Sequence, residues 1–184
     1  METSILSLDV AGLPHAWVTI EDAITYHANQ LVAWSLAREY RGGIQRGGSR
    51  SHIETQSIIA IRGSAVDSRA FARLPALSNQ LLFVRDRHAC AYCGDRFTPR
   101  RLSRDHVLPV STGGRDLWTN VVTACRHCNM RKADRTPEQA RMALRYVPYV
   151  PNRHEHFILR NRYILADQMT ILLAGVPVTS RLHG

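Results

Sequence analysis

The four cysteines of this chain form two Cys-x-x-Cys pairs, Cys90 with Cys93 and Cys125 with Cys128. A Cys-x-x-Cys turn presents two thiolates from one side of the backbone, and two such turns can complete a tetrahedron around zinc. Because a site filled by four thiolates has no open coordination position, the zinc ion is expected to be structural rather than catalytic. The 31 residues between the pairs exceed what a zinc ribbon needs, so a folded segment must lie between them.

The cysteine usage also bears on the compartment. The N-terminal sequence METSILSLDV lacks the basic n-region of a secretory signal. We therefore expect a reducing, cytoplasmic compartment, and metal ligation rather than disulfides. The most apolar stretch, residues 163–178, is interrupted by Asp167 and Gln168 and is too short to span a bilayer. The sequence therefore predicts no membrane partner.

The charge of the chain indicates a polyanionic partner. The formal net charge is +9 and the isoelectric point is about 10.1. Between Arg85 and Arg145, 12 Arg and one Lys stand against 6 acidic residues, so the excess gathers on the cysteine segment. A merely solvated basic surface would not explain this concentration. Nucleic acid is the default partner for such a segment.

The residues between the cysteine pairs predict a strand, a loop, a second strand and a helix. Residues 101–107 can form the first strand, and Ser111-Thr112-Gly113-Gly114 ends it in a loop. Residues 121–123 make a short second strand after Asn120. The helix that begins near Arg126 carries Asn129 and Lys132.

Three side chains in this segment suit phosphodiester hydrolysis. His106 can accept a proton from water near neutral pH. Asp105 and Asn129 offer hard oxygen ligands for Mg²⁺ or Mn²⁺, and Mg²⁺ usually takes only one or two protein groups. Because successive strand residues point to opposite faces, Asp105 and His106 can share one site only if the strand end bends or the metal lies to one side.

The segment closely resembles the HNH endonuclease family, which has a ββα-metal fold. The resemblance rests on Asp105-His106, on Asn120 fourteen residues after the His, and on Asn129 nine residues later inside Cys-x-x-Cys-Asn-x-x-Lys. It covers residues 78–135. It implies a metal-dependent DNA endonuclease with His106 as general base, Asp105 and Asn129 as metal ligands, and Asn120 as the residue that pins the loop and orients the base.

Basic residues around this segment are candidates for contacts to phosphates. We expect Lys132, the only Lys of the chain, to lie near the scissile bond. The other candidates are Arg104, Arg115, Arg126 and Arg131. One such site should cut one strand per visit, so cleavage of both strands would need a homodimer or two encounters. A homodimer is therefore a possible partner.

The flanks predict an α+β fold in three segments. These are an N-terminal α+β extension (1–76), the HNH nuclease domain with its zinc knuckles (77–135) and a C-terminal helical segment (136–184). The expected strands are 5–10, 31–36 and 57–62, the expected helices are 20–28, 79–88, 137–146 and 153–174, and the stretch 38–51 is expected to be a basic, Gly-rich loop.

Two other functions compete with this hypothesis. Zinc-dependent nucleobase deaminases carry His-x-Glu followed by Pro-Cys-x-x-Cys, and the chain contains His52-Ile53-Glu54 before Cys90. However, Ala89 replaces the Pro, and the deaminase pattern leaves Cys125 and Cys128 unexplained. The second alternative is a non-catalytic zinc module that binds DNA, with a vestigial nuclease site.

Overall fold

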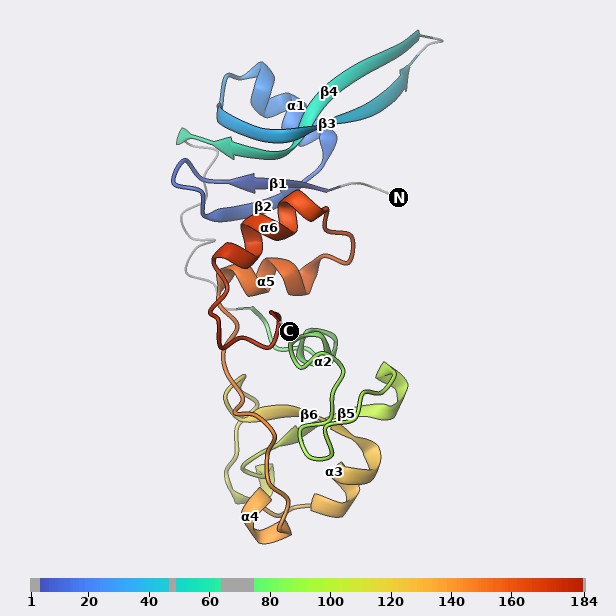
Figure 1. The fold of residues 1–184 in the computed structure, drawn as a ribbon, viewed down its shortest axis with the longest axis vertical. Coiled ribbons are helices and arrows are strands. Elements are labelled where there is room, and N and C mark those ends of the chain that lie inside the picture. The colour runs from blue at the N-terminus through green and yellow to red at the C-terminus, as the bar shows by residue number, and fades with distance from the viewer. Residues whose placement is uncertain (1–3, 47–48, 64–74, 184) are drawn as a thin grey trace. The chain divides into compact units, whose positions relative to one another are not determined.

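The computed structural model describes residues 4–46, 49–63 and 75–183, and it is α+β as predicted (Figure 1). The chain divides into two compact units. We call residues 1–73 with 153–175 the sheet unit, and residues 74–152 with 176–184 the cysteine unit. The three predicted segments group the residues differently and stay a prediction about domains. Within the described ranges, no helix is both long and apolar enough to cross a bilayer.

The sheet unit contains a four-stranded sheet. Its strands are β1 (Ile5–Leu8), β2 (Pro14–Val18), β3 (Val32–Arg46) and β4 (Ser49–Ile61), in the spatial order β2-β1-β4-β3. β1 pairs antiparallel with β2 and parallel with β4, and β3 pairs antiparallel with β4. The sequence did not predict β2.

Helices cover both faces of this sheet (Figure 1). On one face lies α1 (Ile20–Ala28), whose Ala23 packs with Ile5 and Ile59. On the other lie α5 (Arg153–Arg160) and α6 (Ala166–Ala174), where Phe157 and Leu172 pack with strand residues. All four residues of β1 are buried, as expected for a strand with both faces covered.

Two predictions for the sheet unit are wrong. The expected loop 38–51 is mostly strand, because β3 and β4 form one long hairpin that pairs as far as Arg46 with Ser49. The side chains of residues 37–55 lie outside the described part of the chain. The expected helix 153–174 is two helices, because the Asn161 side chain accepts a hydrogen bond from the Tyr163 N–H and replaces the helical pattern there.

The cysteine unit has the predicted strand–loop–strand–helix order. After α2 (Asn79–Arg85), the strands β5 (Leu102–His106) and β6 (Val121–Cys125) pair antiparallel, and α3 (Arg126–Lys132) and α4 (Pro137–Ala140) follow. Two short 3₁₀ turns, η3 (Pro99–Arg101) and η4 (Val110–Thr112), flank β5. The Ser78 hydroxyl caps α2 by accepting from the Leu81 N–H at 3.2 Å.

A buried ion pair anchors α2 to the strands. Arg85 is 0% exposed and forms an ion pair with Asp86, also 0% exposed, at 2.8 Å. The Arg85 guanidinium also donates to the carbonyls of Trp118, Val121 and Tyr149, at 2.8 to 2.9 Å. Because the charges are paired and hydrogen-bonded, the pair is tolerated in the core. It holds the start of β6 in place.

The predicted helix 137–146 is shorter than expected. The Thr136 and Gln139 capping box begins α4 as predicted, but α4 ends at Ala140 and Arg141 takes a left-handed conformation with φ 54°. The chain then turns back, and the Arg145 N–H donates to the Ala91 carbonyl at 2.8 Å. This long-range pairing, rather than helix propensity, sets the end of α4.

Candidate zinc site and hydrolytic cleft

The four cysteine sulfurs lie within 4.8 Å of one another. Sulfurs of a tetrahedral zinc site with Zn–S bonds of about 2.3 Å are separated by about 3.8 Å, so the set fits one zinc ion. Each knuckle also directs a backbone N–H at its first sulfur, from Tyr92 to Cys90 Sγ and from Cys128 to Cys125 Sγ, both at 3.4 Å. Burial raises the pKa of Cys93 to about 11 and raises the pKa of Cys128 as well. Burial thus disfavours the thiolate forms of Cys93 and Cys128, and a bound cation would favour them.

Backbone hydrogen bonds hold the first knuckle against β6. The Ala91 N–H donates to the Thr123 carbonyl at 2.8 Å, and Thr123 lies two residues before Cys125. Gly94, with φ 85°, lets the turn close with its N–H on the Cys90 carbonyl at 2.9 Å. The two cysteine pairs are therefore brought together by strand β6.

Asp105 lies on β5 and is 5% exposed. Its Oδ1 accepts from Lys132 Nζ at 3.0 Å, and its Oδ2 accepts from the Tyr92 hydroxyl. Burial, followed by the hydrogen bond to Asp105, raises the pKa of Tyr92, so the phenol keeps its proton and is the donor. A carboxylate has about four acceptor positions, so this one has room for further partners.

His106 is paired with an acid that the sequence did not predict. His106 Nε2 lies 3.1 Å from Asp116 Oδ1, and Asp116 also accepts from Arg104. The hydrogen bond from Arg104 holds the pKa of Asp116 below its usual value. Because an ionised carboxylate only accepts hydrogen bonds, Nε2 carries the proton in neutral His106. Nδ1 is then the acceptor nitrogen, and it accepts no hydrogen bond from any described residue. Asp116 is an acid in the loop after Gly113-Gly114, and nothing else in the sequence marks it as a partner of His106.

Asn129 presents an oxygen. Its Nδ2 donates to the Arg104 carbonyl at 3.3 Å and to Ser103 Oγ at 2.9 Å. Since a carbonyl can only accept, the NH₂ group must face Arg104. The amide oxygen accepts no hydrogen bond from any residue in the described ranges, which leaves it available to a cation.

Asn120 holds the loop between the strands. Its Oδ1 accepts from the Leu108 N–H at 2.9 Å, and its Nδ2 donates to the carbonyls of Leu108 and Arg115 at 3.1 and 2.9 Å. The loop packs tightly, because a Cβ on Gly114 would overlap the Leu108 carbonyl. Asn120 thereby fixes the loop that carries Asp116 beside His106.

Asp105, His106 and Asn129 line one cleft of about 310 Å³. The neighbouring strand residues Asp105 and His106 therefore border the same cleft, and β5 ends at His106. The remaining lining residues are Arg104, Pro109, Val110, Met130, Lys132, Ala133 and Asp134.

The predicted phosphate-binding residues occupy different environments. Lys132 is 1% exposed and donates to Asp105 and to the His106 carbonyl at 2.7 Å, so it is not at the surface. Arg104 is engaged by Asn79 and Asp116. Arg115, Arg126 and Arg131 are exposed.

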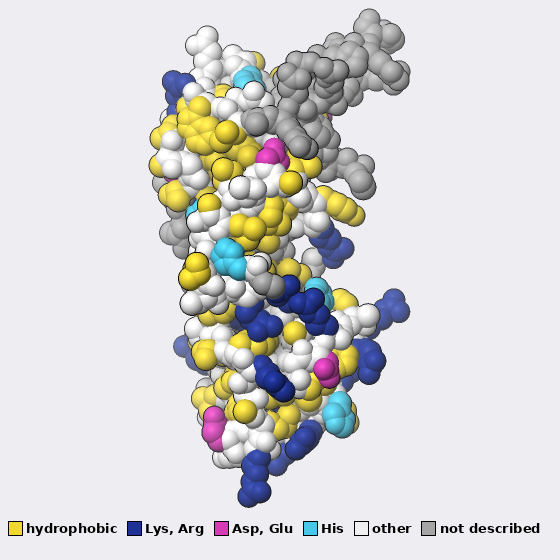
Figure 2. All heavy atoms as spheres, viewed as in Figure 1, with side chains coloured by type: hydrophobic (Ala, Val, Ile, Leu, Met, Phe, Trp, Pro, Cys, Tyr) yellow, Lys and Arg dark blue, Asp and Glu magenta, His cyan; other side chains and the backbone are white. Residues whose placement is uncertain are grey.

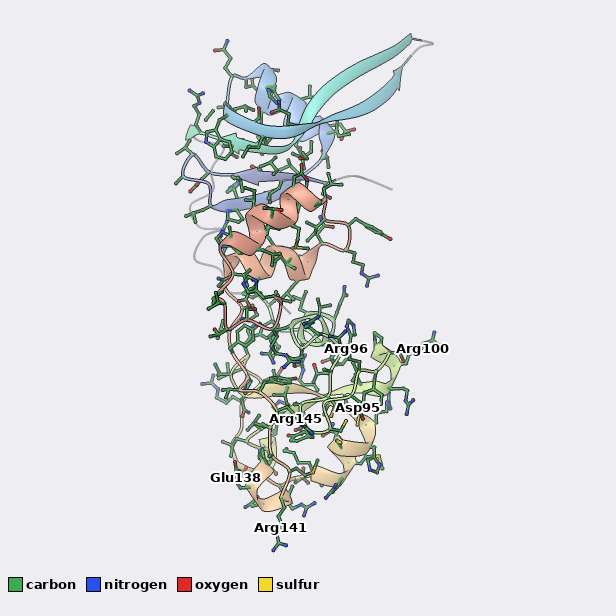
Figure 3. The ribbon with its side chains drawn as sticks, viewed as in Figure 1. Asp95, Arg96, Arg100, Glu138, Arg141 and Arg145 are labelled. Atoms are coloured by element: carbon green, nitrogen blue, oxygen red, sulfur yellow. The ribbon has the colours of Figure 1, made fainter. Side chains whose placement is uncertain are left out.

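Other exposed Arg side chains add to the basic character of this unit. Arg100 and Arg141 were not singled out by the sequence, and their side chains extend outward (Figure 3). Basic side chains are also visible over the cysteine unit in the space-filling view (Figure 2).

Comparisons with known proteins identify one family that matches this part of the chain. Residues 90–145 match the HNH endonuclease family, which confirms the resemblance predicted from the sequence. No curated protein is significantly similar to the chain. Among solved structures, the type II-C Cas9 enzyme from Actinomyces naeslundii matches with 18% sequence identity and a TM-score of 0.30. That match covers 56% of this chain and 13% of the Cas9 chain.

Proposed function

We propose that this chain is a metal-dependent DNA endonuclease that hydrolyses phosphodiester bonds with His106 as general base. The observation that carries the proposal is the single cleft lined by Asp105, His106 and Asn129. These are a base and two oxygen ligands in one place, which is the set that metal-assisted hydrolysis of a phosphodiester requires.

Each residue has a distinct task in this proposal. His106 accepts a proton from water at Nδ1, because Nε2 is directed at Asp116. Asp105 and the free amide oxygen of Asn129 would hold Mg²⁺ or Mn²⁺. The divalent cation, when bound, neutralises charge on the scissile phosphate and the leaving oxygen. Asn120 keeps the loop with Asp116 in register with His106.

The remaining features support the partners and cofactors. The four cysteine sulfurs would hold a structural zinc ion, a use of cysteine that is typical of a reducing compartment such as the cytoplasm. The family that residues 90–145 match acts on nucleic acid. Exposed Arg115, Arg126 and Arg131 would contact phosphates. Oligomeric state decides whether one strand or both are cut.

The test is nicking of supercoiled plasmid by purified protein with Mg²⁺, with Mn²⁺ and with EDTA. We expect nicking only with the divalent ions, and His106→Ala should lower its rate about 10²- to 10⁴-fold, as loss of a general base does. His27→Ala is the matched control, because His27 is exposed on α1 in the sheet unit. It should nick as the wild type does.

Two results would contradict the proposal. Nicking that survives His106→Ala would remove His106 as the base. A wild-type protein that binds DNA but never nicks it with either ion would instead be the non-catalytic zinc module. A filter-binding titration at several salt concentrations identifies that case, because phosphate contacts make the affinity fall steeply with salt.

A further inference from the structure

We infer that Tyr92 is a positioning residue for Asp105, through which the first cysteine knuckle sets the geometry of the hydrolytic metal site. The inference rests on the proposed function, in which Asp105 is a ligand of the divalent cation. It adds a physical link between two sites that the sequence presents as independent. The link is one hydrogen bond, from the Tyr92 hydroxyl to Asp105 Oδ2.

The two partners of this hydrogen bond are shielded from water. Tyr92 is 7% exposed and Asp105 is 5% exposed. The other carboxylate oxygen of Asp105 is held by Lys132, which is 1% exposed. Buried polar groups of this kind have no solvent to replace a lost partner, so each hydrogen bond has a large effect on geometry.

Tyr92 itself is fixed by the knuckle. It lies between Cys90 and Cys93, and its N–H points at the Cys90 sulfur. Its carbonyl accepts from Arg145 Nε at 3.2 Å. The neighbouring Ala91 is bonded on both sides, to Thr123 and to Arg145. The phenol ring is therefore directed at Asp105 by the turn that carries Cys90 and Cys93.

Two donors on two oxygens determine the plane of the Asp105 carboxylate. The terminal torsion of an Asp side chain has a broad energy profile, so one donor alone leaves the group free to rotate. Lys132 has a flexible stem and three donors, and it does not define a direction by itself. With Tyr92 on Oδ2 and Lys132 on Oδ1, the Asp105 carboxylate is held in one orientation at the cleft that Asn129 also lines. Second-shell partners of metal ligands commonly act in this way.

The test is the binding of Mn²⁺ to Tyr92→Phe without DNA, measured by the electron paramagnetic resonance signal of free Mn²⁺. We expect the Kd for Mn²⁺ to rise about 10-fold, the lower end of what loss of a second-shell partner costs. Zinc content and the midpoint of thermal unfolding should match those of the wild type, since Phe keeps the ring.

Tyr146→Phe is the matched control. Tyr146 packs against the same cysteine cluster, and its buried hydroxyl makes no hydrogen bond to Asp105 or Lys132. Like Tyr92→Phe, the Tyr146→Phe variant loses one phenol oxygen, but its Mn²⁺ affinity and zinc content should equal those of the wild type. A 10-fold weakening in this variant too would mean that any lost hydroxyl in the cluster disturbs the site, which would overturn the inference.

A double-mutant cycle tells whether Tyr92 acts on Mn²⁺ binding through Asp105 or by disturbing the site as a whole. In an Asp105→Asn background, Tyr92→Phe should change the Kd by less than about twofold, because the acceptor it positions is altered. An equal effect in both backgrounds would overturn the inference, as would loss of zinc from Tyr92→Phe. If the wild type neither binds Mn²⁺ nor nicks DNA, the proposed function fails. If it does both and Tyr92→Phe matches it, only the inference fails.

Discussion

The two units of this chain obtain their cores in different ways. In the sheet unit, two apolar clusters lie on opposite faces of one sheet, one under α1 and the other under α5 and α6. In the cysteine unit, Cys90, Cys125 and Cys128 are themselves members of the largest buried cluster. The core of the sheet unit is mainly apolar, and the core of the cysteine unit is built around four sulfurs that fit a metal ion.

This difference determines how each unit should respond to damage. A zinc-centred core concentrates its stabilisation in one ion, whose binding contributes folding free energy directly. An apolar core distributes its stabilisation over many contacts, so each deletion removes a few kcal/mol at most. The following three predictions test the contrast, from the largest expected effect to the smallest.

Removal of zinc should unfold only the cysteine unit. Structural zinc contributes on the order of 10 kcal/mol in small zinc domains, which is comparable to the whole stability of a typical domain. With a strong chelator, hydrogen exchange followed by mass spectrometry should show loss of amide protection in β5 and β6 and retention in β1 and β4. Added Zn²⁺ should restore protection and Mg²⁺ should not. Simultaneous loss in all four strands would show that the units unfold together and would end the comparison.

Deletion of apolar volume should weaken only the sheet unit. Leu172 is fully buried on α6 among β1 and β4 residues, so Leu172→Ala should cost about 2–5 kcal/mol of unfolding free energy. Urea denaturation of the sheet unit measures this, with zinc stoichiometry unchanged. Val10→Ala is the control, because Val10 is 58% exposed and should change stability by less than about 0.5 kcal/mol. Zinc loss from Leu172→Ala would contradict the separation.

The helix caps offer the smallest and most closely matched test. Thr19 begins α1 in the sheet unit and Thr136 begins α4 in the cysteine unit, each with a capping box. Replacement of either Thr by Ala should cost about 1 kcal/mol. Only Thr136→Ala should make zinc easier to remove by a chelator. Thr→Ser at the same positions retains the hydroxyl and should restore wild-type behaviour. If the two Ala variants lost zinc to the chelator equally readily, the stability of the zinc site would not depend on the cysteine unit alone.

The contrast also explains what the sequence could predict. In the cysteine unit, the candidate residues stand at short, characteristic spacings, so Asp105, His106, Asn120 and Asn129 could be chosen as candidates from the sequence alone. β5, β6 and α3 followed because each is bounded by a strong local signal, such as Gly113-Gly114. Residue spacing could not reveal Asp116 or the Tyr92 contact to Asp105, because these hydrogen bonds depend on how side chains meet across the loop and the knuckle.

The sheet unit was harder to predict because its order arises from distant pairing. β1 pairs with β4 across about fifty residues, and α5 and α6 reach the sheet after the whole cysteine segment. Gly-rich stretches such as 42–48 favour a loop locally, and only the partner strand makes the hairpin. The early end of α4 has the same origin, since the pairing of Arg145 with Ala91 overrides the helical pattern.

The burial of Lys132 has a practical consequence. It is the only lysine of the chain and is 1% exposed, with its amine on Asp105 and on the His106 carbonyl. Amine-reactive reagents therefore have no accessible lysine side chain in the folded protein. Acylation of Lys132 requires the amine to leave Asp105 first. The rate of acylation at Lys132, followed by mass spectrometry, therefore reports how often the cleft opens.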